Sequence, residues 1–207
     1  MKTDVIINRE ALYALRELPS ESVNCCVTSP PYYGLRDYGL DAQIGREDKP
    51  EQYIDRLVEV FRELCRVLKD DGTFWLNIAD TYCGSGMKTG CKQKDLIGIP
   101  WLLAFALRSD GWYLRSDIIW LKENPMPESC RDRPSRCYEH IFLLTKTSVY
   151  KGYKRDKIQM RGDRAEISDF PLYLNTVAGG LDCRDQTIGG FSFVVKIYAV
   201  PVVEIIG

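Results

Sequence analysis

The chain has 207 residues, enough for one full domain with a sizeable core but not comfortably for two. Hydrophobic residues make up 45% and charged residues 28%, a composition that argues against a disordered or fibrous protein. The sequence shows no secretory signal and no apolar run of membrane-spanning length, so we expect a cytoplasmic protein with no membrane partner. A formal net charge of −1 still allows nucleic acid as a partner, because binding needs only a local basic face.

The eight cysteines favour free thiols over a disulfide framework, because their spacings do not repeat and no secretion signal accompanies them. A zinc site would have to combine Cys83, Cys91, Cys130 and Cys137. These positions lack the short ligand spacing of structural zinc sites. We therefore expect no bound metal.

The first elements read as strand, helix and strand. Residues 4–7 form a short apolar run, and residues 10–18 carry leucines at helical spacing before Pro19. Residues 23–28 are continuously apolar and β-branched, which is typical of a strand buried on both faces of a sheet. The strand must end where Ser29-Pro30-Pro31-Tyr32 begins, because prolines cannot continue a central strand.

Strands and helices continue to alternate along the chain. The pattern predicts helices over 50–69, closed by Asp70-Asp71-Gly72, and over 99–108, and strands over 73–79, 117–122 and 141–146. Such alternation predicts an α/β domain with a mostly parallel sheet, whose ligands lie beyond the carboxyl ends of the strands. Periodicity is poor beyond about Asp169, although residues 191–207 are apolar and strand-like.

The turn Ser29-Pro30-Pro31-Tyr32 carries the chemistry. Two prolines fix two φ angles and remove two backbone donors, so the segment presents acceptors rigidly. The Ser29 hydroxyl and the Pro30 carbonyl, placed side by side, can accept both hydrogens of an amino group and aim its lone pair at an electrophile. Tyr32 adds an aromatic face on which an extruded nucleobase can stack.

Residues 28–39 resemble the catalytic segment of the site-specific DNA amino-methyltransferases, the S-adenosylmethionine-dependent family that acts on cytosine N4 or adenine N6. The resemblance continues through residues 71–82, 116–129 and 132–146, and it covers roughly residues 4–150. It implies a Rossmann-like methyltransferase fold in which the catalytic segment comes first in the chain. It also implies S-adenosylmethionine as cofactor and double-stranded DNA as partner. It also raises restriction-modification as the biological setting.

The resemblance assigns roles to individual residues. Ser29, Pro30, Pro31 and Tyr32 are the catalytic residues, and serine at the first position favours cytosine N4 over the alternative, adenine N6. Enzymes with the related motif Asn-Pro-Pro-Tyr methylate glutamine side chains in proteins, so a protein substrate is the less favoured alternative. Asn8, Glu10 and Thr28 are the expected cofactor contacts, although Glu10 is equally suited to starting a helix. Trp120, Asn124 and Pro125 would wall the target-base pocket, or else form an ordinary strand and loop.

Two basic clusters are the candidate DNA contacts. The first contains Arg131, Arg133 and Arg136, some of which could instead pair with Asp132 and Glu128. The second is a basic loop that contains Lys151, Lys154, Arg155 and Lys157, with a solvated surface loop as the alternative. We expect a monomer or a homodimer.

One departure from the family concerns the cofactor loop. Members of this arrangement carry a glycine-rich loop near the C-terminus, and residues 151–207 contain none. Residues 82–86 resemble such a loop superficially, but the polar segment after them lacks an apolar helix face. The expected organisation is a catalytic core over 1–150, possibly incomplete in its C-terminal part, and a divergent segment over 151–207. An inactive DNA-binding fragment is therefore the alternative hypothesis to an active enzyme.

Overall fold

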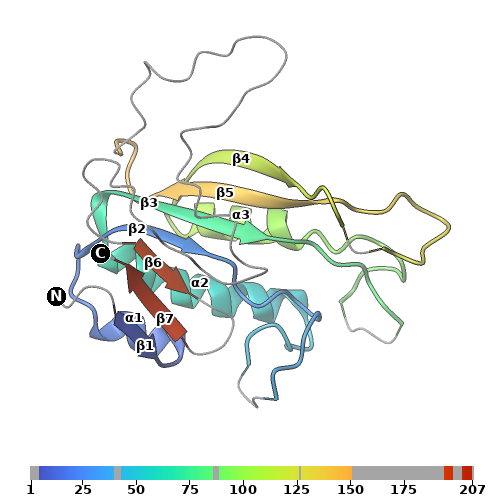
Figure 1. Ribbon diagram of the computed structural model, residues 1–207, viewed down its shortest axis with the longest axis horizontal. Helices are drawn as coiled ribbons and strands as arrows, with labels where there is room; N and C mark the ends of the chain where they lie inside the picture. Colours follow the sequence, from blue (N-terminus) through green and yellow to red (C-terminus); the bar gives the residue numbers. More distant parts are fainter. Residues whose placement is uncertain are drawn as a thin grey trace, which may run out of the picture. The chain divides into compact units, whose positions relative to one another are not determined.

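The computed structural model describes residues 5–39, 43–85, 89–125, 127–150, 194–197 and 202–206. In this part of the chain strands and helices alternate as far as β4, and three further strands follow (Figure 1). In chain order they are β1 Val5–Asn8, α1 Ala11–Glu17, β2 Val23–Thr28, α2 Pro50–Val67, β3 Leu68–Ile78, α3 Ile99–Ser109, β4 Tyr113–Leu121, β5 Tyr138–Thr145, β6 Val194–Ile197 and β7 Val202–Ile206. No helix among these is long and apolar enough to cross a membrane.

The described strands form one sheet in the order β1-β7-β6-β2-β3-β5-β4. Strand β2 pairs in parallel with β3 and β6, and the other four pairings are antiparallel. Following these directions across the sheet, β1, β2, β3, β4 and β6 point one way, and β5 and β7 are inserted in the opposite sense. The α/β class is confirmed, and five of the seven strands share a direction as predicted. The neighbouring pairs are nevertheless mostly antiparallel, because each reversed strand lies between two others.

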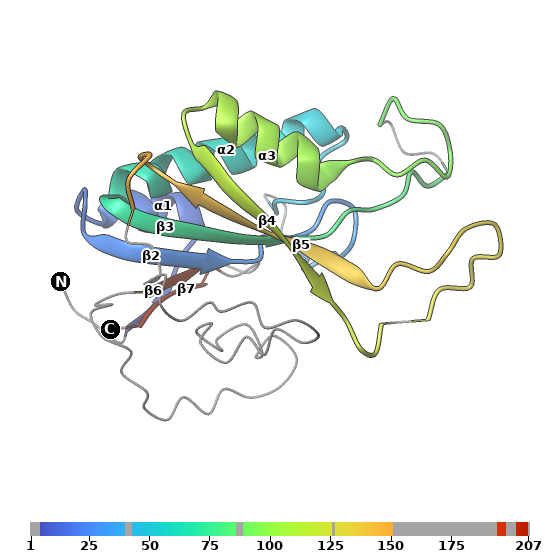
Figure 2. The same ribbon diagram turned by 90° about the horizontal axis from the view of Figure 1, so that it is seen from above.

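Helices α2 and α3 pack side by side on one face of the sheet (Figure 2). Alternate residues of β3 point toward them, so Phe74, Leu76 and Ile78 are fully buried in the main core. The intervening side chains of β3, Trp75 and Asn77, therefore lie on the opposite face. That face carries the site described below.

The junction between α2 and β3 differs from the prediction. Asp70-Asp71-Gly72 does not close the helix; α2 ends at Val67 and these residues lie inside β3. The pairing with β2 jumps from Val23–Leu68 to Cys25–Thr73, which marks a bulge. Gly72 has no side chain at the closest approach, where a Cβ would lie 3.0 Å from the Asn24 carbonyl oxygen. The strand therefore starts earlier because a glycine lets the bulge pack against β2.

Two further strand boundaries also differ. Strand β4 begins at Tyr113 rather than 117, and β5 spans Tyr138–Thr145 rather than 141–146. The early part of β4 is polar and exposed because it lies at the sheet edge, so it lacks the apolar pattern of a buried strand. The strand-like reading of residues 191–207 is confirmed at β6 and β7. The predicted domain boundary at residue 150 stays a prediction.

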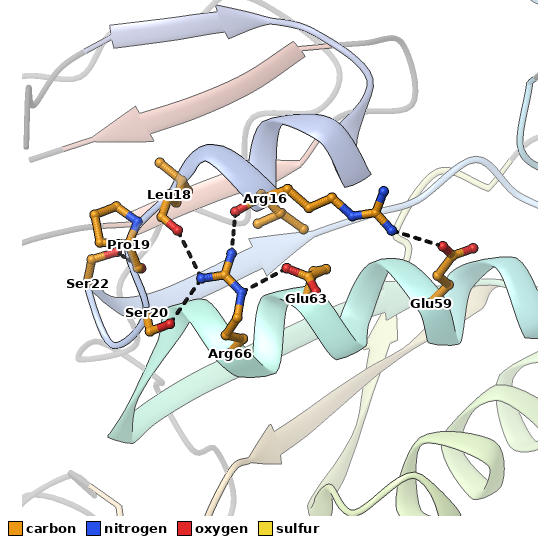
Figure 3. A network of polar contacts seen from close by, with 9 residues as sticks. Arg16, Leu18, Pro19, Ser20, Ser22, Glu59, Glu63 and Arg66 are labelled. Carbon is orange, nitrogen blue, oxygen red and sulfur yellow. Dashed lines mark hydrogen bonds and ion pairs between the residues drawn. The ribbon is translucent and has the colours of Figure 1, made fainter.

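The end of α1 is fixed to α2 by Arg66 (Figure 3). Its guanidinium donates to the carbonyl oxygens of Leu15 at 2.9 Å and Leu18 at 3.0 Å, and to the Ser20 hydroxyl at 3.1 Å. Glu63, one turn earlier on α2, accepts from Arg66 Nε at 2.8 Å and orients it. The bond to Leu18 satisfies a carbonyl group at the end of the helix, and the bond to Leu15 adds to the one that its carbonyl accepts from Leu18 N–H. The seven cysteines that the structure describes are free, as expected.

Candidate active site

The turn Ser29-Pro30-Pro31-Tyr32 follows β2 directly and lies at the carboxyl edge of the sheet. Its carbonyl groups are used differently. The Pro31 carbonyl accepts a 2.7 Å hydrogen bond from the hydroxyl of Tyr53, a buried residue of α2. Among the described residues, none donates to the Pro30 carbonyl. The turn is therefore anchored at Pro31 and leaves the Pro30 carbonyl beside Ser29 available to a ligand.

A second loop supports the turn from behind. Gly34 N–H donates to the Gly45 carbonyl at 2.8 Å. Gly45 has φ +97°, and a Cβ there would lie 2.9 Å from the Tyr32 carbonyl oxygen. Only glycine satisfies both the backbone angle and this close approach. The turn from Ser29 to Tyr32 is thus braced by backbone contacts as well as by its prolines.

Three side chains surround the Tyr32 hydroxyl. It accepts from the Ser29 hydroxyl at 3.0 Å and from Asn77 Nδ2 at 3.0 Å, and it donates to Glu139 Oε2 at 2.8 Å. Asn77 Nδ2 also contacts Glu139 Oε2 at 2.9 Å. Asn77 lies on β3 and Glu139 on β5, while Ser29 and Tyr32 follow the end of β2, so three neighbouring strands contribute. A polar network therefore connects Ser29 to Glu139, and within the described residues Asn77 Oδ1 is buried without a hydrogen-bond partner.

The network extends to the edge strand β4. Glu139 is opposite Trp120 in the pairing of β5 with β4, so both side chains lie on the same face. The Lys122 ammonium forms an ion pair with Glu139 Oε1 and lies 5.7 Å from the centre of the Trp120 ring. Trp120, predicted to wall a base pocket, thus lies beside Lys122 and Glu139 on the face that carries the network. Asn124 is exposed and Pro125 partly buried just beyond.

These contacts determine the ionisation states of Glu139 and Tyr32. Burial raises the pKa of Glu139, but hydrogen bonds from Lys122, Asn77 and Tyr32 outweigh it and the pKa lies below its usual value. Burial first, and then the negative charge of Glu139, raise the pKa of Tyr32 far above its usual range. At neutral pH the site thus holds an ionised carboxylate and a neutral phenol.

The predicted cofactor contacts are spread along the sheet edge. Asn8 ends β1 with its side chain exposed, and Thr28 ends β2 with its side chain buried. Glu10 Oε2 accepts from Tyr13 N–H at 3.1 Å and caps α1, the alternative that the sequence also allowed. Strands β1 and β2 point the same way, so their carboxyl ends lie at the same edge of the sheet. This edge therefore carries Asn8, Glu10 and Thr28. Their role in binding a cofactor stays a prediction.

The arginine cluster is only partly available to a partner. Arg131 is exposed. Arg133 lies 3.6 Å from the Tyr82 ring centre and pairs with Glu128, which is one of the salt bridges considered above. Arg136 donates to the Asp80 carbonyl, and Asp132 pairs with Lys94 rather than with an arginine. Lys151, Lys154, Arg155 and Lys157 lie outside the described residues.

The loop after β3 does not continue into a helix at residues 82–85. Instead Cys83 exchanges backbone hydrogen bonds with Asp95 and Lys94, at 2.8 and 2.9 Å. Asp80, at the end of β3, accepts from Gly98 N–H at 3.0 Å and Ile99 N–H at 2.9 Å, which caps α3. Residues 82–85 thus form one side of a returning loop, as the polar composition indicated.

Sequence reasoning missed Asn77, Glu139, Lys122 and Tyr53. Asn77 and Glu139 lie within segments that carry the family resemblance, and a buried asparagine inside an apolar strand was the available signal. Nothing in the sequence placed Glu139 next to residues 107 positions earlier. Tyr53 lies in the helix predicted over 50–69, but no feature of the sequence marked it as a support for the turn.

Fold and site together define a class: an α/β domain with a polar, diproline-braced site at the carboxyl edge of its sheet. A family model described as "DNA methylase" matches residues 23–170, which is well over half of the chain. The chain therefore belongs to the DNA methylase family.

Individual relatives agree. The chain is 53% identical over 161 residues to the type II methyltransferase M.Cfr9I of Citrobacter freundii, covering 68% of this chain and 54% of that protein. The solved PvuII DNA methyltransferase (cytosine-N4-specific) is similar in fold, with a TM-score of 0.54, 21% identity, and coverage of 69% and 49%. A Thermus thermophilus protein assigned as a DNA modification methylase, complexed with S-adenosyl-L-methionine, has a TM-score of 0.51, 24% identity, and coverage of 71% and 55%. The chain spans about half the length of the curated relatives it matches.

Proposed function

We propose that this protein transfers a methyl group from S-adenosylmethionine to the exocyclic N4 of a cytosine extruded from double-stranded DNA. The observation that carries the proposal is the pair of acceptors at the end of β2. The Ser29 hydroxyl donates its proton to Tyr32 at 3.0 Å, so its lone pairs remain for a ligand. The neighbouring Pro30 carbonyl accepts no hydrogen bond from a described residue.

Two adjacent acceptors suit an aromatic amine. The nitrogen lone pair of such an amine is delocalised into the ring, which makes it a weak nucleophile. Hydrogen bonds from both N–H groups to Ser29 and Pro30 favour a pyramidal nitrogen whose lone pair points away from the protein. Because the prolines and the Tyr53 bond hold the turn, this arrangement exists before the substrate binds.

The choice of cytosine N4 is supported by Ser29, since serine at the first motif position resembles the cytosine-N4 enzymes. The target base would be held between the catalytic turn and Trp120, the aromatic residue beside Lys122 and Glu139. The Ser29 hydroxyl is the group that would contact N4. Adenine N6 is the alternative substrate.

Residues at the sheet edge are chemically suited to S-adenosylmethionine. Asn8 presents an exposed amide, and Glu10 a partly buried carboxylate with only Oε2 in a described hydrogen bond. In the sheet order, β1 is three strands from β2, roughly 14 Å at the usual strand spacing. Asn8 and Glu10 would thus hold the polar adenosine part of the cofactor, while Ser29 holds the base that receives the methyl group. When bound, the cofactor supplies an electrophilic methyl group.

DNA would be held by positive charge around this site. Arg131 is exposed close to the loop that follows β4, and it is suited to a phosphate contact. Arg133 and Arg136 act mainly on Tyr82 and Asp80, and would contact DNA only by exchanging those partners. We propose the same phosphate contacts for Lys151, Lys154, Arg155 and Lys157 of the predicted basic loop.

The test is methylation by the purified protein. Duplex DNA is incubated with labelled S-adenosylmethionine, digested to nucleosides and analysed for N4-methylcytosine. Ser29→Ala should lower the rate by about 10²-fold or more, because it removes one of two acceptors. Ser148→Ala, an exposed serine after β5, serves as control. Saturable DNA binding without any transfer would contradict the proposal and favour an inactive DNA-binding protein; N6-methyladenine would shift it to the alternative substrate.

A further inference from the structure

Glu139 is a buried carboxylate of β5 in the polar network behind Ser29. Glu139 is only 7% exposed. Oε2 accepts from the Tyr32 hydroxyl at 2.8 Å and from Asn77 Nδ2 at 2.9 Å, and Oε1 forms the ion pair with Lys122. Burying an ionised carboxylate is costly unless it is paired in this way. A buried ion pair is weak evidence for stability, so we looked for an effect of this carboxylate on the neighbouring hydrogen bonds.

The hydrogen-bond directions supply one. An ionised carboxylate can only accept, so the Tyr32 proton must point to Glu139. The Tyr32 oxygen then accepts from Ser29 and Asn77, both at 3.0 Å. The proton of Ser29 is thereby directed into the protein. Each bond in the series Ser29, Tyr32, Glu139 fixes the direction of the one before it.

The opposite direction would disable the turn as an acceptor. If Glu139 were a neutral donor, the Tyr32 oxygen could accept from it and turn its proton toward Ser29. Ser29 would then accept inside the protein, and its own proton would point at the incoming amine. A donor facing a donor repels, so the amine would lose one of its two contacts.

We infer that Glu139 is a positioning residue for methyl transfer: acting through the Tyr32 hydroxyl, it fixes Ser29 as a hydrogen-bond acceptor for the substrate amine. The inference rests on the proposed function and adds a residue that contacts neither substrate nor cofactor. Lys122 and Asn77 complete the device, since both donate to Glu139 and neither can accept through the donating nitrogen.

The groups around Glu139 keep it ionised in the working pH range. The titratable or charged groups on the packed elements are Tyr32 after β2 and Lys122 after β4, with Arg136 acting on Tyr32. His140, the next residue, turns to the other face and contacts Asp117 at 2.9 Å. Protonation of Glu139 at acid pH should therefore remove the acceptor state of Ser29, and the rate of transfer should fall with it.

The decisive variant is Glu139→Gln, which keeps size and hydrogen bonding but allows donation to Tyr32. Single-turnover methylation should slow by about 10²-fold, while KM for DNA and for S-adenosylmethionine changes less than about twofold. Tyr32→Phe should slow the rate similarly, and the double variant should be no slower than either single variant, because the contacts act in series. Glu139→Asp should recover part of the rate. Glu59→Gln, from an exposed pair with Arg16, is the matched control.

A pH profile separates positioning from a structural role. The wild-type rate should fall toward acid as Glu139 takes up a proton, and Glu139→Gln should lose this step of the profile. If Glu139→Gln retains the wild-type rate and profile while the wild type methylates DNA, the inference is overturned and the proposed function stands.

A measurement without catalysis covers the remaining case. If the wild type transfers no methyl group, the proposed function fails. Carboxyl NMR titration of Glu139 then tests the contact itself, and Tyr32→Phe should raise the pKa of Glu139 by removing a hydrogen bond to its charged form. An unchanged pKa would overturn the link between the two residues.

Discussion

The hydroxyl of Tyr53 donates a 2.7 Å hydrogen bond to the carbonyl of Pro31, which connects helix α2 to the turn from Ser29 to Tyr32. Tyr53 is fully buried, and its ring also packs against Tyr33 with a 5.5 Å centroid separation. Because a diproline segment has no backbone donors of its own, side chains must hold it in place. The position of the proposed acceptor pair therefore depends on a helix residue with no direct contact with the ligand.

Replacing Tyr53 with phenylalanine should reveal this dependence. The variant keeps the ring but leaves the Pro31 carbonyl without its partner, which should lower the free energy of unfolding by about 1–2 kcal/mol. Methylation should slow as the turn loosens. Urea denaturation and single-turnover rates measure the two effects. Wild-type stability together with a wild-type rate would show that the bond does not hold the turn.

Gly45→Ala tests the loop behind the turn. The new Cβ would lie 2.9 Å from the Tyr32 carbonyl oxygen at a φ of +97°, so we expect a loss of about 2–4 kcal/mol and reduced activity. Gly39→Ala is the matched control, because Gly39 also has positive φ, +72°, but a Cβ there would have no atom within 4 Å. Thermal unfolding should rank wild type, Gly39→Ala and Gly45→Ala in decreasing stability. Equal losses for both variants would contradict the close approach.

The ion pair of Lys122 with Glu139 predicts how stability depends on pH. The folded-state pKa of Glu139 is below its unfolded value, so its contribution is present above the unfolded value and is lost as pH falls through the folded value. Lys122→Met removes the ion pair and should move this loss to higher pH. Unfolding free energies measured between about pH 3 and 7 test this.

Lys94→Met provides the comparison for that experiment. Lys94 pairs with Asp132 at the surface, where the two side chains are 73% and 52% exposed. Screening by water makes such a pair weak, so we expect a much smaller change in the acid range than for Lys122→Met. Indistinguishable profiles for the two variants would argue against a buried pair at Glu139.

Arg66 should contribute more to stability than its neighbour Arg16. Arg66 makes hydrogen bonds to Leu15, Leu18 and Ser20, whereas Arg16 has one exposed contact with Glu59 (Figure 3). Arg66→Ala should cost about 1–3 kcal/mol because it removes these three hydrogen bonds and leaves the Leu18 carbonyl without its charged donor. Arg16→Ala should cost less than about 0.5 kcal/mol. Chemical denaturation of both variants decides, and a larger loss for Arg16→Ala would refute this account of the helix end.

The buried elements were predictable because their patterns are local. Strand β2 was predicted at its observed bounds, since continuous apolar residues followed by two prolines leave little choice. Strand β3 began earlier than predicted because the Asp70-Asp71-Gly72 stop signal is absorbed by a bulge against β2. The reversed direction of β5 could not be predicted, because strand direction depends on pairing between segments distant in sequence.

The site was predictable only where a motif marked it. Ser29 to Tyr32 were identified because prolines and aromatic residues at that spacing are unusual, and Trp120 came from the family resemblance. Glu139 gave no signal, since an acid between Tyr138 and His140 looks like any polar residue near a strand end. Its role comes from the sheet order, which brings β5 next to β3, with β3 alone between β5 and β2. Tertiary contact, not local sequence, selects it.

The measurement that tests the central claim most directly is a crystal structure of the protein with duplex DNA and a non-reactive analogue of S-adenosylmethionine. We expect an extruded cytosine whose N4 lies about 3 Å from both the Ser29 hydroxyl oxygen and the Pro30 carbonyl oxygen. An extruded base whose amino nitrogen contacts neither oxygen, or a turn that remains covered by the protein in the complex, would contradict the account.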